Sequence, residues 1–433
     1  MSPTTKRTQP DPDADEAKAP PEQVKTKFCP KLTSDESARI EREDTPEREV
    51  EAAAAGKPLP RLELTYPSKT LSPGENGPPV PFQQPTPLTT FSYDSERELR
   101  FDDSSLRYYV DPPHGADLRH GYEKWIKRPE EKGRLDGLLR AWLRVRNGLP
   151  DEFMNGGVIA WRGVMTRILT APYEEREGWQ LNVMCVNGTV YLEEHISDAK
   201  LLEKENLTPH HRLQTYYGYS FESFCTSGMP HAKTGWGGDV DTNIQWCSVV
   251  KTKLGNTRLV IGGEVDCVRG KSTKTNDTLV ELKTSLTIRG QQDESRFEKK
   301  LLKFYFQSFL LGVPEIIVGF RSPAGKLGTV QSFQTMQIPR MVRGKPGSWD
   351  PNVCLGWGER FLEFVKEAVQ GDVHSAPDGV EEVPVVWRVE FKPGVGISMS
   401  QLGPEAVEEV QEGSDRYGFL PRWYWEGSLY NQA

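Results

Sequence analysis

Two short segments in the middle of the chain alternate polar and apolar residues, which predicts strands. Residues 263–266 read Gly-Glu-Val-Asp and residues 280–283 read Val-Glu-Leu-Lys. Successive side chains of a strand point to opposite faces, so the polar members of each segment share one face. The turn-rich residues 269–277 lie between them. We therefore expect a β-hairpin with three carboxylates and a lysine on one face.

The same patterning predicts helices and strands over most of the chain. Apolar residues recur with a helical period in residues 135–145, 296–311 and 352–370, and a further helix is expected to end near residue 224. Gly312 and Pro314 are typical of a helix end. Strands are expected at 106–110, 158–163, 179–185, 190–192, 315–320, 328–338 and 385–391. Because these strands and helices do not alternate strictly, we expect one mixed α/β (α+β) domain over residues 86–433.

Residues 1–85 differ from the rest in composition. They are poor in aromatic residues and rich in Pro, Glu, Asp, Lys and Thr, which predicts a disordered start followed by an extended Pro-rich arm. Leu62, Leu64 and Phe82 are among the residues expected to anchor this arm on the domain. No run approaches the roughly 18 apolar residues that a membrane span needs, so we expect no membrane association.

Composition limits the chemistry that the domain can perform. The six cysteines form no C-x-x-C pair, which argues against a zinc knuckle or a disulfide framework. The formal net charge is −8, whereas a protein that coats nucleic acid non-specifically is usually basic. A nucleic-acid substrate would therefore have to be held by local basic clusters and by metal.

Asp266, Glu281 and Lys283 form the pattern D…E-x-K. In metal-dependent phosphodiester cleavage, such carboxylates hold Mg²⁺ or Mn²⁺, and the lysine orients the attacking water or stabilises charge on the phosphate. Charged pairs that flank an apolar residue are also common on solvated strand faces, so the pattern alone leaves both interpretations open. Glu264 adds a third acid to the same face and favours the metal site.

Two single residues outside the hairpin are further candidates. Glu222 lies near the end of a predicted helix among aromatic residues, where it is either a surface acid or a fourth metal ligand. Arg162 lies in an otherwise apolar segment that we interpret as a strand. An arginine in that position needs a structural carboxylate or a substrate phosphate as its partner.

The predicted helix at 296–311 carries a basic stripe. The stripe is spaced four, three and four residues apart, which places its members on one helix face: Arg296, Lys300, Lys303 and Gln307. A row of cations that ends in an amide suits a phosphate backbone that approaches a metal site. The alternative is an ordinary solvated helix face.

In their order along the chain, these motifs resemble the DXO/Rai family of RNA 5′-end decapping nucleases. The resemblance extends over roughly residues 90–390. It is carried by Trp-Arg-Gly at 161–163 with Leu-Thr-Ala-Pro-Tyr-Glu at 169–174, Gly-Tyr-Ser-Phe-Glu at 218–222, Gly-Glu-Val-Asp at 263–266, Glu-Leu-Lys at 281–283, and residues 304–314.

The resemblance implies a fold and a set of residue roles. The fold is two mixed β-sheets flanked by helices, with a core related to the D…E-x-K nucleases. Two divalent cations, Mg²⁺ or Mn²⁺, are implied. The implied roles are metal binding by Glu222, Glu264, Asp266, Glu281 and the Leu282 carbonyl; positioning of the water and the scissile phosphate by Lys283 and Gln307; and RNA phosphate binding by Arg162. The helix with Arg296, Lys300 and Lys303 would then steer the RNA strand.

The resemblance also implies an activity. Family members remove abnormal RNA 5′ ends: they release pyrophosphate from triphosphorylated RNA and remove incompletely methylated caps and NAD caps. Some also degrade RNA 5′→3′, and fungal nuclear members stabilise a large 5′→3′ exoribonuclease. We therefore expect a metal-dependent 5′-end hydrolase in the nucleus, with the cytoplasm as the alternative. The alternative functions are a stabilising partner of the exoribonuclease, a 5′→3′ exonuclease, or a DNA nuclease on the same core.

Overall fold

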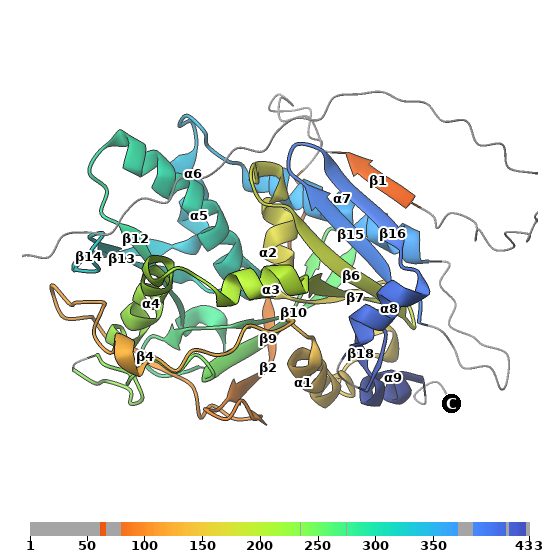
Figure 1. Cartoon of the computed structure of the whole chain (residues 1–433), viewed down its shortest axis with the longest axis horizontal. Helices are drawn as coiled ribbons and strands as arrows, with labels where there is room; N and C mark the ends of the chain where they lie inside the picture. The colour runs from red at the N-terminus through yellow and green to blue at the C-terminus, as the bar shows by residue number, and fades with distance from the viewer. Residues whose placement is uncertain are drawn as a thin grey trace, which may run out of the picture. The chain divides into compact units, whose positions relative to one another are not determined.

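The computed structural model describes residues 61–65, 79–233, 235–273, 275–370, 384–412 and 415–429. Most of the predicted N-terminal arm therefore lies outside the described residues. The described chain forms two large mixed β-sheets with flanking helices, which confirms the predicted fold class (Figure 1). Among these helices, none combines the length and the apolar character that crossing a bilayer requires.

The larger sheet has ten strands. Its centre, β7-β5-β10, is parallel, and its other neighbouring strands pair antiparallel. In spatial order the strands are β1 (Arg61–Thr65), β16 (Gly396–Gln401), β15 (Trp387–Lys392), β6 (Trp179–Val186), β7 (Thr189–His195), β5 (Val158–Trp161), β10 (Thr257–Glu264), β9 (Gln245–Leu254), β2 (Thr86–Tyr93) and β3 (Leu99–Arg100).

The second sheet has six strands, in the order β14 (Leu327–Gln334), β13 (Glu315–Arg321), β12 (Leu279–Leu286), β11 (Cys267–Val268), β4 (Tyr108–Tyr109) and β8 (Thr226–Ser227). β12 and β13 are parallel, and α5 (Gln291–Leu311) makes the crossover between them. α5 begins earlier than predicted because its first turn is polar and shows no apolar period. It ends as predicted, at Gly312 with φ 72°.

The remaining helices cover the sheets, and β17 (Arg416–Tyr417) pairs with β18 (Leu420–Pro421) near the C-terminal end. In Figure 1, α2 stands between the strands of the two large sheets. The helices are α1 (Asp136–Arg146), α2 (Arg162–Thr170), α3 (Asp198–Glu205), α4 (Pro209–Phe224), α6 (Ile338–Val342), α7 (Pro351–Val369), α8 (Pro404–Gln411) and α9 (Arg422–Leu429).

Alternation along the strands divides the apolar interior of the described chain into three cores. In β10, Leu259 and Ile261 enter one core and Val260 enters another. The first core joins both large sheets through α2, α5 and α7. The second lies between the ten-stranded sheet and α1, α8 and α9, and the third between the six-stranded sheet and α4. Leu62, Leu64 and Phe82 pack against the first core, as expected for anchoring residues.

The predicted hairpin is wrong in its first strand. β10, which ends at Glu264, belongs to the ten-stranded sheet, and only the short β11 pairs with β12. The chain crosses from one sheet to the other around Asp266, while Val265 stays buried. A polar-apolar-polar pattern is the same whether the strand continues or the chain crosses between sheets, so the sequence could not distinguish them. The acids therefore lie where the two sheets meet.

Two further predictions need correction. The strand expected at 158–163 ends at Trp161, and Arg162 is the first residue of α2. The strand expected at 328–338 ends at Gln334, and the chain continues in a short 3-10 helix and then α6. Sequence analysis also missed β9, a long strand in which continuous burial hides the alternation.

Candidate active site

Glu222 is delivered to the site by the packing of α4 on the six-stranded sheet. Its neighbour Phe221 is fully buried against Gly319 of β13. A Cβ at Gly319 would lie 2.4 Å from the Phe221 ring, so glycine is what allows the helix to approach this closely. The last turn of α4 is fixed in this way, and Glu222 faces the junction between the sheets.

Glu281 is the most enclosed acid of the site. Its side chain has 0% exposure, and its two oxygens accept from different cations: Oε2 from the Arg162 guanidinium at 2.9 Å and Oε1 from Lys283 Nζ at 2.6 Å. Burial opposes ionisation of Glu281, but these two cations outweigh it and hold its pKa well below the usual range. Glu281 is therefore a charged group fixed between two protein cations.

Asp266 and Glu264 flank this centre and are held by other partners. The Leu282 N–H donates to Asp266 Oδ2 at 2.6 Å, and Gln245 Nε2 donates to Glu264 Oε2 at 2.8 Å. Burial, and then the charge of Glu281, raise the pKa of Asp266 to about 7. Burial also raises the pKa of Glu264, although the Arg162 guanidinium opposes the shift. Both carboxyls resist ionisation in the absence of a further cation.

Glu222 completes the group of acids. Burial, and then the charges of Asp266 and Glu264, raise its pKa well above the usual value, while Lys283 opposes the shift. Three acids of raised pKa beside a fourth that is ionised form a site with an excess of negative charge. This is the electrostatic character of a cation-binding site.

The donor set fits a hard divalent cation. Carboxylate oxygens are the ligands that Mg²⁺ and Mn²⁺ prefer. As the side chains stand, however, the described residues contain no group of three Asp, Glu, His or Cys side chains arranged to hold a metal ion. The absence of such a group follows in part from the contacts of Glu281, because both of its oxygens are engaged by Arg162 and Lys283. Cation binding would require these side chains to reorient.

A cavity of about 440 Å³ opens onto the acids. Glu222, Glu264 and Asp266 line it, and Glu281 lies outside the lining. The walls also carry three cations and several aromatic side chains: Arg107, Lys127, Arg128, Trp125, Tyr219 and Trp246. Trp125 and Tyr219 have their ring centroids 5.9 Å apart. Cations beside aromatic rings suit phosphate and base, respectively.

The predicted basic stripe on α5 does not line this cavity. Arg296 pairs with Asp293 at 3.4 Å and Lys303 with Glu174 at 3.0 Å, while Lys300 is exposed. Gln307 is half-buried on the same helix, which packs against β10 and β12, but within the described chain its side chain makes no hydrogen bond. The structure thus brings together the predicted acids, Lys283 and Arg162, and places the cations of the stripe, Arg296, Lys300 and Lys303, outside the lining of the cavity.

Sequence analysis missed the cations of the cavity wall. Lys127 and Arg128 follow Trp125 with one residue between, and basic residues near an aromatic one are a usable signal for nucleic acid. The signal was hidden by Glu130 and Glu131, which make the segment look like a solvated charged loop. In the structure these acids pair with the two cations, Lys127 with Glu130 at 3.0 Å and Arg128 with Glu131.

The sequence matches a known family and several curated proteins. A family model described as RAI1-like PD-(D/E)XK nuclease matches residues 83–425. A decapping nuclease RAI1 from Mycosarcoma maydis is 36% identical over 443 residues, covering 80% of this chain and 87% of the relative. A decapping and exoribonuclease protein from Mus musculus is 36% identical over 392 residues, covering 88% and 94%.

Solved structures resemble the chain over most of its length. S. pombe Rai1 in complex with 3′-FADP has a TM-score of 0.64 and 29% identity, covering 80% of this chain and 100% of the other. Candida albicans Rai1 in complex with pU5 and Mn²⁺ has a TM-score of 0.69 and 25% identity, covering 86% and 99%. The similarity therefore extends over most of the chain.

Proposed function

The chain belongs to the RAI1-like PD-(D/E)XK nuclease family and is an RNA 5′-end decapping nuclease, and we propose that its reaction takes place at Glu222, Glu264, Asp266 and Glu281. The observation that carries this assignment is the cavity that three of these acids line together with Arg107, Lys127 and Arg128. Three acids of raised pKa and three cations thus meet in one cavity.

The proposed substrates are RNAs with abnormal 5′ ends. Triphosphorylated RNA would lose pyrophosphate, and incompletely methylated caps and NAD caps would be removed. Two observations support this range. The Rai1 structures of S. pombe and Candida albicans contain 3′-FADP and pU5 with Mn²⁺, respectively. In this chain the cavity places cations for phosphate and aromatic rings for bases beside the acids.

Two divalent cations, Mg²⁺ or Mn²⁺, would be held by the four carboxylates, with the Leu282 carbonyl as a further proposed ligand. When bound, they polarise the scissile phosphate and lower the pKa of a water. Lys283 lies 2.6 Å from Glu281 and is proposed to orient that water, with Gln307 assisting from α5. Arg162 contacts Glu281, so its proposed bond to RNA phosphate requires that carboxylate to release it.

A panel of 5′-end-labelled RNAs tests the proposed function. The purified full chain with Mn²⁺ should release pyrophosphate from 5′-triphosphate RNA and a dinucleotide from capped RNA, while single-stranded DNA of the same sequence remains intact. Identification of the released species separates end hydrolysis from 5′→3′ degradation, which yields mononucleotides. If no labelled RNA end is hydrolysed with either Mn²⁺ or Mg²⁺, the proposal is wrong.

Cation binding should strengthen as the pH rises through about 7. The pKa of Asp266 is raised to about 7, so below that pH its carboxyl holds a proton that a cation must displace. The apparent Mn²⁺ affinity, measured by calorimetry, should rise by up to about tenfold per pH unit for each proton displaced between about pH 6 and pH 8. Without cation, the melting temperature should fall over the same interval, because ionising a buried acid of raised pKa costs stability. An affinity independent of pH would contradict the assignment of Asp266.

We also propose that the protein acts in the nucleus and binds a large 5′→3′ exoribonuclease. The support is the resemblance to fungal family members. Two fungal relatives of this chain are named decapping nuclease RAI1. Co-sedimentation of the purified full chain with such an exoribonuclease tests the interaction. Asp266→Asn should still bind the partner, since the binding surface need not include the acids.

A further inference from the structure

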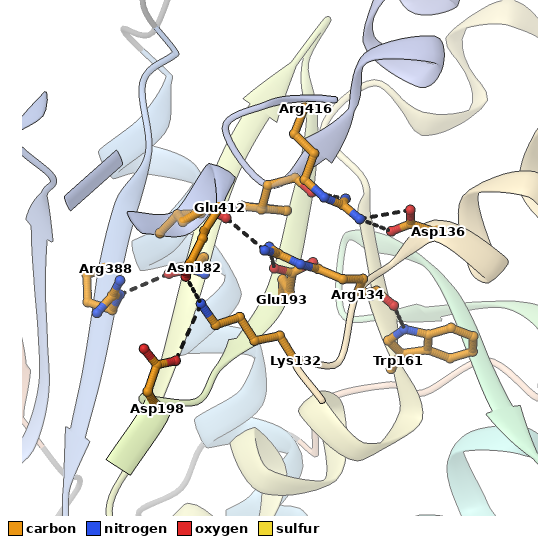
Figure 2. A network of polar contacts seen from close by, with 12 residues as sticks. Lys132, Arg134, Asp136, Trp161, Asn182, Glu193, Asp198, Arg388, Glu412 and Arg416 are labelled. Carbon is orange, nitrogen blue, oxygen red and sulfur yellow. Dashed lines mark hydrogen bonds and ion pairs between the residues drawn. The ribbon is translucent and has the colours of Figure 1, made fainter. Parts of the chain in front are cut away.

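The segment that forms one wall of the cavity is tied to the C-terminal part of the chain. Glu131 and Gly133 line the cavity, whereas the alternate residues Lys132, Arg134 and Asp136 make contacts with residues 410–416 (Figure 2). The segment turns here, since the Arg134 N–H donates to the Lys132 carbonyl at 2.9 Å, and α1 begins at Asp136. Glu131 and Gly133 therefore face the proposed site of RNA binding, while Lys132, Arg134 and Asp136 reach α8 and the residues that follow it.

Arg134 is the centre of these contacts. Its guanidinium donates to Glu193 Oε1 and to the Val410 carbonyl, both at 2.9 Å. Its own carbonyl accepts from Trp161 Nε1, also at 2.9 Å. Glu193 lies in β7 of the ten-stranded sheet, and Val410 lies in the last turn of α8. Arg134 thus joins the ten-stranded sheet, α8 and Trp161, the residue that precedes Arg162.

Ion pairs of Lys132 and Asp136 flank Arg134 on the same segment. Lys132 Nζ lies 3.0 Å from Glu412 and 3.7 Å from Asp198. Arg416 forms hydrogen bonds with both oxygens of Asp136, at 2.9 and 3.0 Å. Figure 2 shows the three contacts in a row between the cavity wall and the C-terminal segment. They hold the end of the wall nearest α1, and at the other end the Arg128 N–H donates to Thr242 Oγ1 at 2.8 Å.

The Arg134–Glu193 pair has the properties of a rigid anchor. The two side chains are only 16% and 2% exposed, so water competes little for their hydrogen bonds. The planar guanidinium serves two acceptors in fixed directions, which a lysine ammonium on a flexible chain does not reproduce. The carbonyl at the end of α8 carries partial negative charge and favours a cation there.

We propose that Arg134 is a positioning residue for RNA binding, through which the C-terminal segment 404–425 holds the cavity wall 127–133 in place. The wall carries Lys127 and Arg128, whose charges are directed at the RNA only if the loop keeps its position. The inference rests on the proposed function, since it assigns the wall to RNA. Arg134 itself does not line the cavity.

Arg134→Lys tests the proposal because it keeps the positive charge but removes the planar guanidinium that serves two acceptors. We expect KM for 5′-triphosphate RNA to rise about tenfold while kcat stays within about threefold, since a misplaced wall weakens binding more than chemistry. The double variant Arg134→Met with Glu193→Gln removes the pair without leaving a buried charge, and should show the same KM increase. Burial raises the pKa of Glu193 to about 7, so a neutral glutamine is a fair replacement.

Arg388→Met is the matched control. Arg388 donates to Asn182 at 2.9 Å in the same region, but neither residue lines the cavity. The KM of Arg388→Met should therefore equal that of the wild type. Unchanged KM in both Arg134 variants, or a fall in kcat alone, would overturn the proposal and leave a structural role. Hydrogen exchange at residues 127–133 should rise in the Arg134 variants only.

Binding of a fluorescent 5′-phosphorylated RNA to the same proteins separates this inference from the proposed function. If the wild type fails to hydrolyse RNA but binds it more tightly than Arg134→Lys does, the proposed function is wrong and the positioning role holds. If hydrolysis proceeds and all variants bind RNA equally, the positioning role is wrong.

Discussion

Replacing Asp266 by asparagine is expected to slow hydrolysis of RNA 5′ ends by about a thousandfold or more, the size typical of losing charge stabilisation in a transition state. Asparagine has the same shape as aspartate and can still accept from the Leu282 N–H, which donates to Asp266 at 2.6 Å. It lacks the negative charge that a divalent cation requires. The rate should be measured with Mn²⁺ in excess, so that weakened cation binding does not limit it.

The same substitution should leave the fold intact and raise its stability above about pH 7. Burial and the charge of Glu281 raise the pKa of Asp266 to about 7, so holding the carboxylate ionised costs free energy at higher pH. Asparagine removes that cost. In cation-free buffer the melting temperature of Asp266→Asn should exceed that of the wild type near pH 8 and approach it only near pH 4, where the aspartate of the unfolded chain also becomes protonated. A variant that stays active, or that is less stable at both pH values, would contradict the assignment.

The sequence located the chemistry of the site better than its architecture. Acids around a buried apolar residue, as in Glu264-Val265-Asp266, indicated that polar side chains converge. The pattern could not show that β10 and β12 belong to different sheets, because either path buries Val265 and turns its two neighbours to the opposite side. Which strands pair depends on contacts distant in sequence, such as β10 with β5. No local pattern encodes those contacts.

The cavity wall shows a different limit. Lys127 and Arg128 are followed by Glu130 and Glu131, so the local charge is balanced and the segment resembles a solvated loop. Its contacts are with residues distant in sequence, Arg128 with Thr242 and Arg134 with Glu193 and Val410. For the α5 stripe, the sequence predicted cations at the site that do not line the cavity. Its periodicity correctly predicted a helix, but the spacing does not show which face turns toward the acids.

Arg162→Met should destabilise the cation-free protein by about 3 kcal/mol, the low end for breaking a buried pair. Glu281 is 0% exposed and Arg162 13% exposed, so the substitution leaves a buried carboxylate with Lys283 as its one remaining cationic contact in the described chain. Hydrolysis should fall as well, because Arg162 also attracts Asp266 and Glu264. Urea unfolding without divalent cation measures the loss.

Mn²⁺ should restore part of the stability lost in Arg162→Met, because a cation among the acids compensates the charge of Glu281. The wild type also gains stability from Mn²⁺ by mass action, so the quantity to compare is the increase in melting temperature that Mn²⁺ causes in each protein. Arg134→Met is the control: it breaks a pair of similar burial with Glu193, away from the acids, and Mn²⁺ should stabilise it no more than the wild type. Equal increases in all three proteins would show that Glu281 is not a cation ligand, and that Arg162 and Lys283 hold it for structural reasons alone.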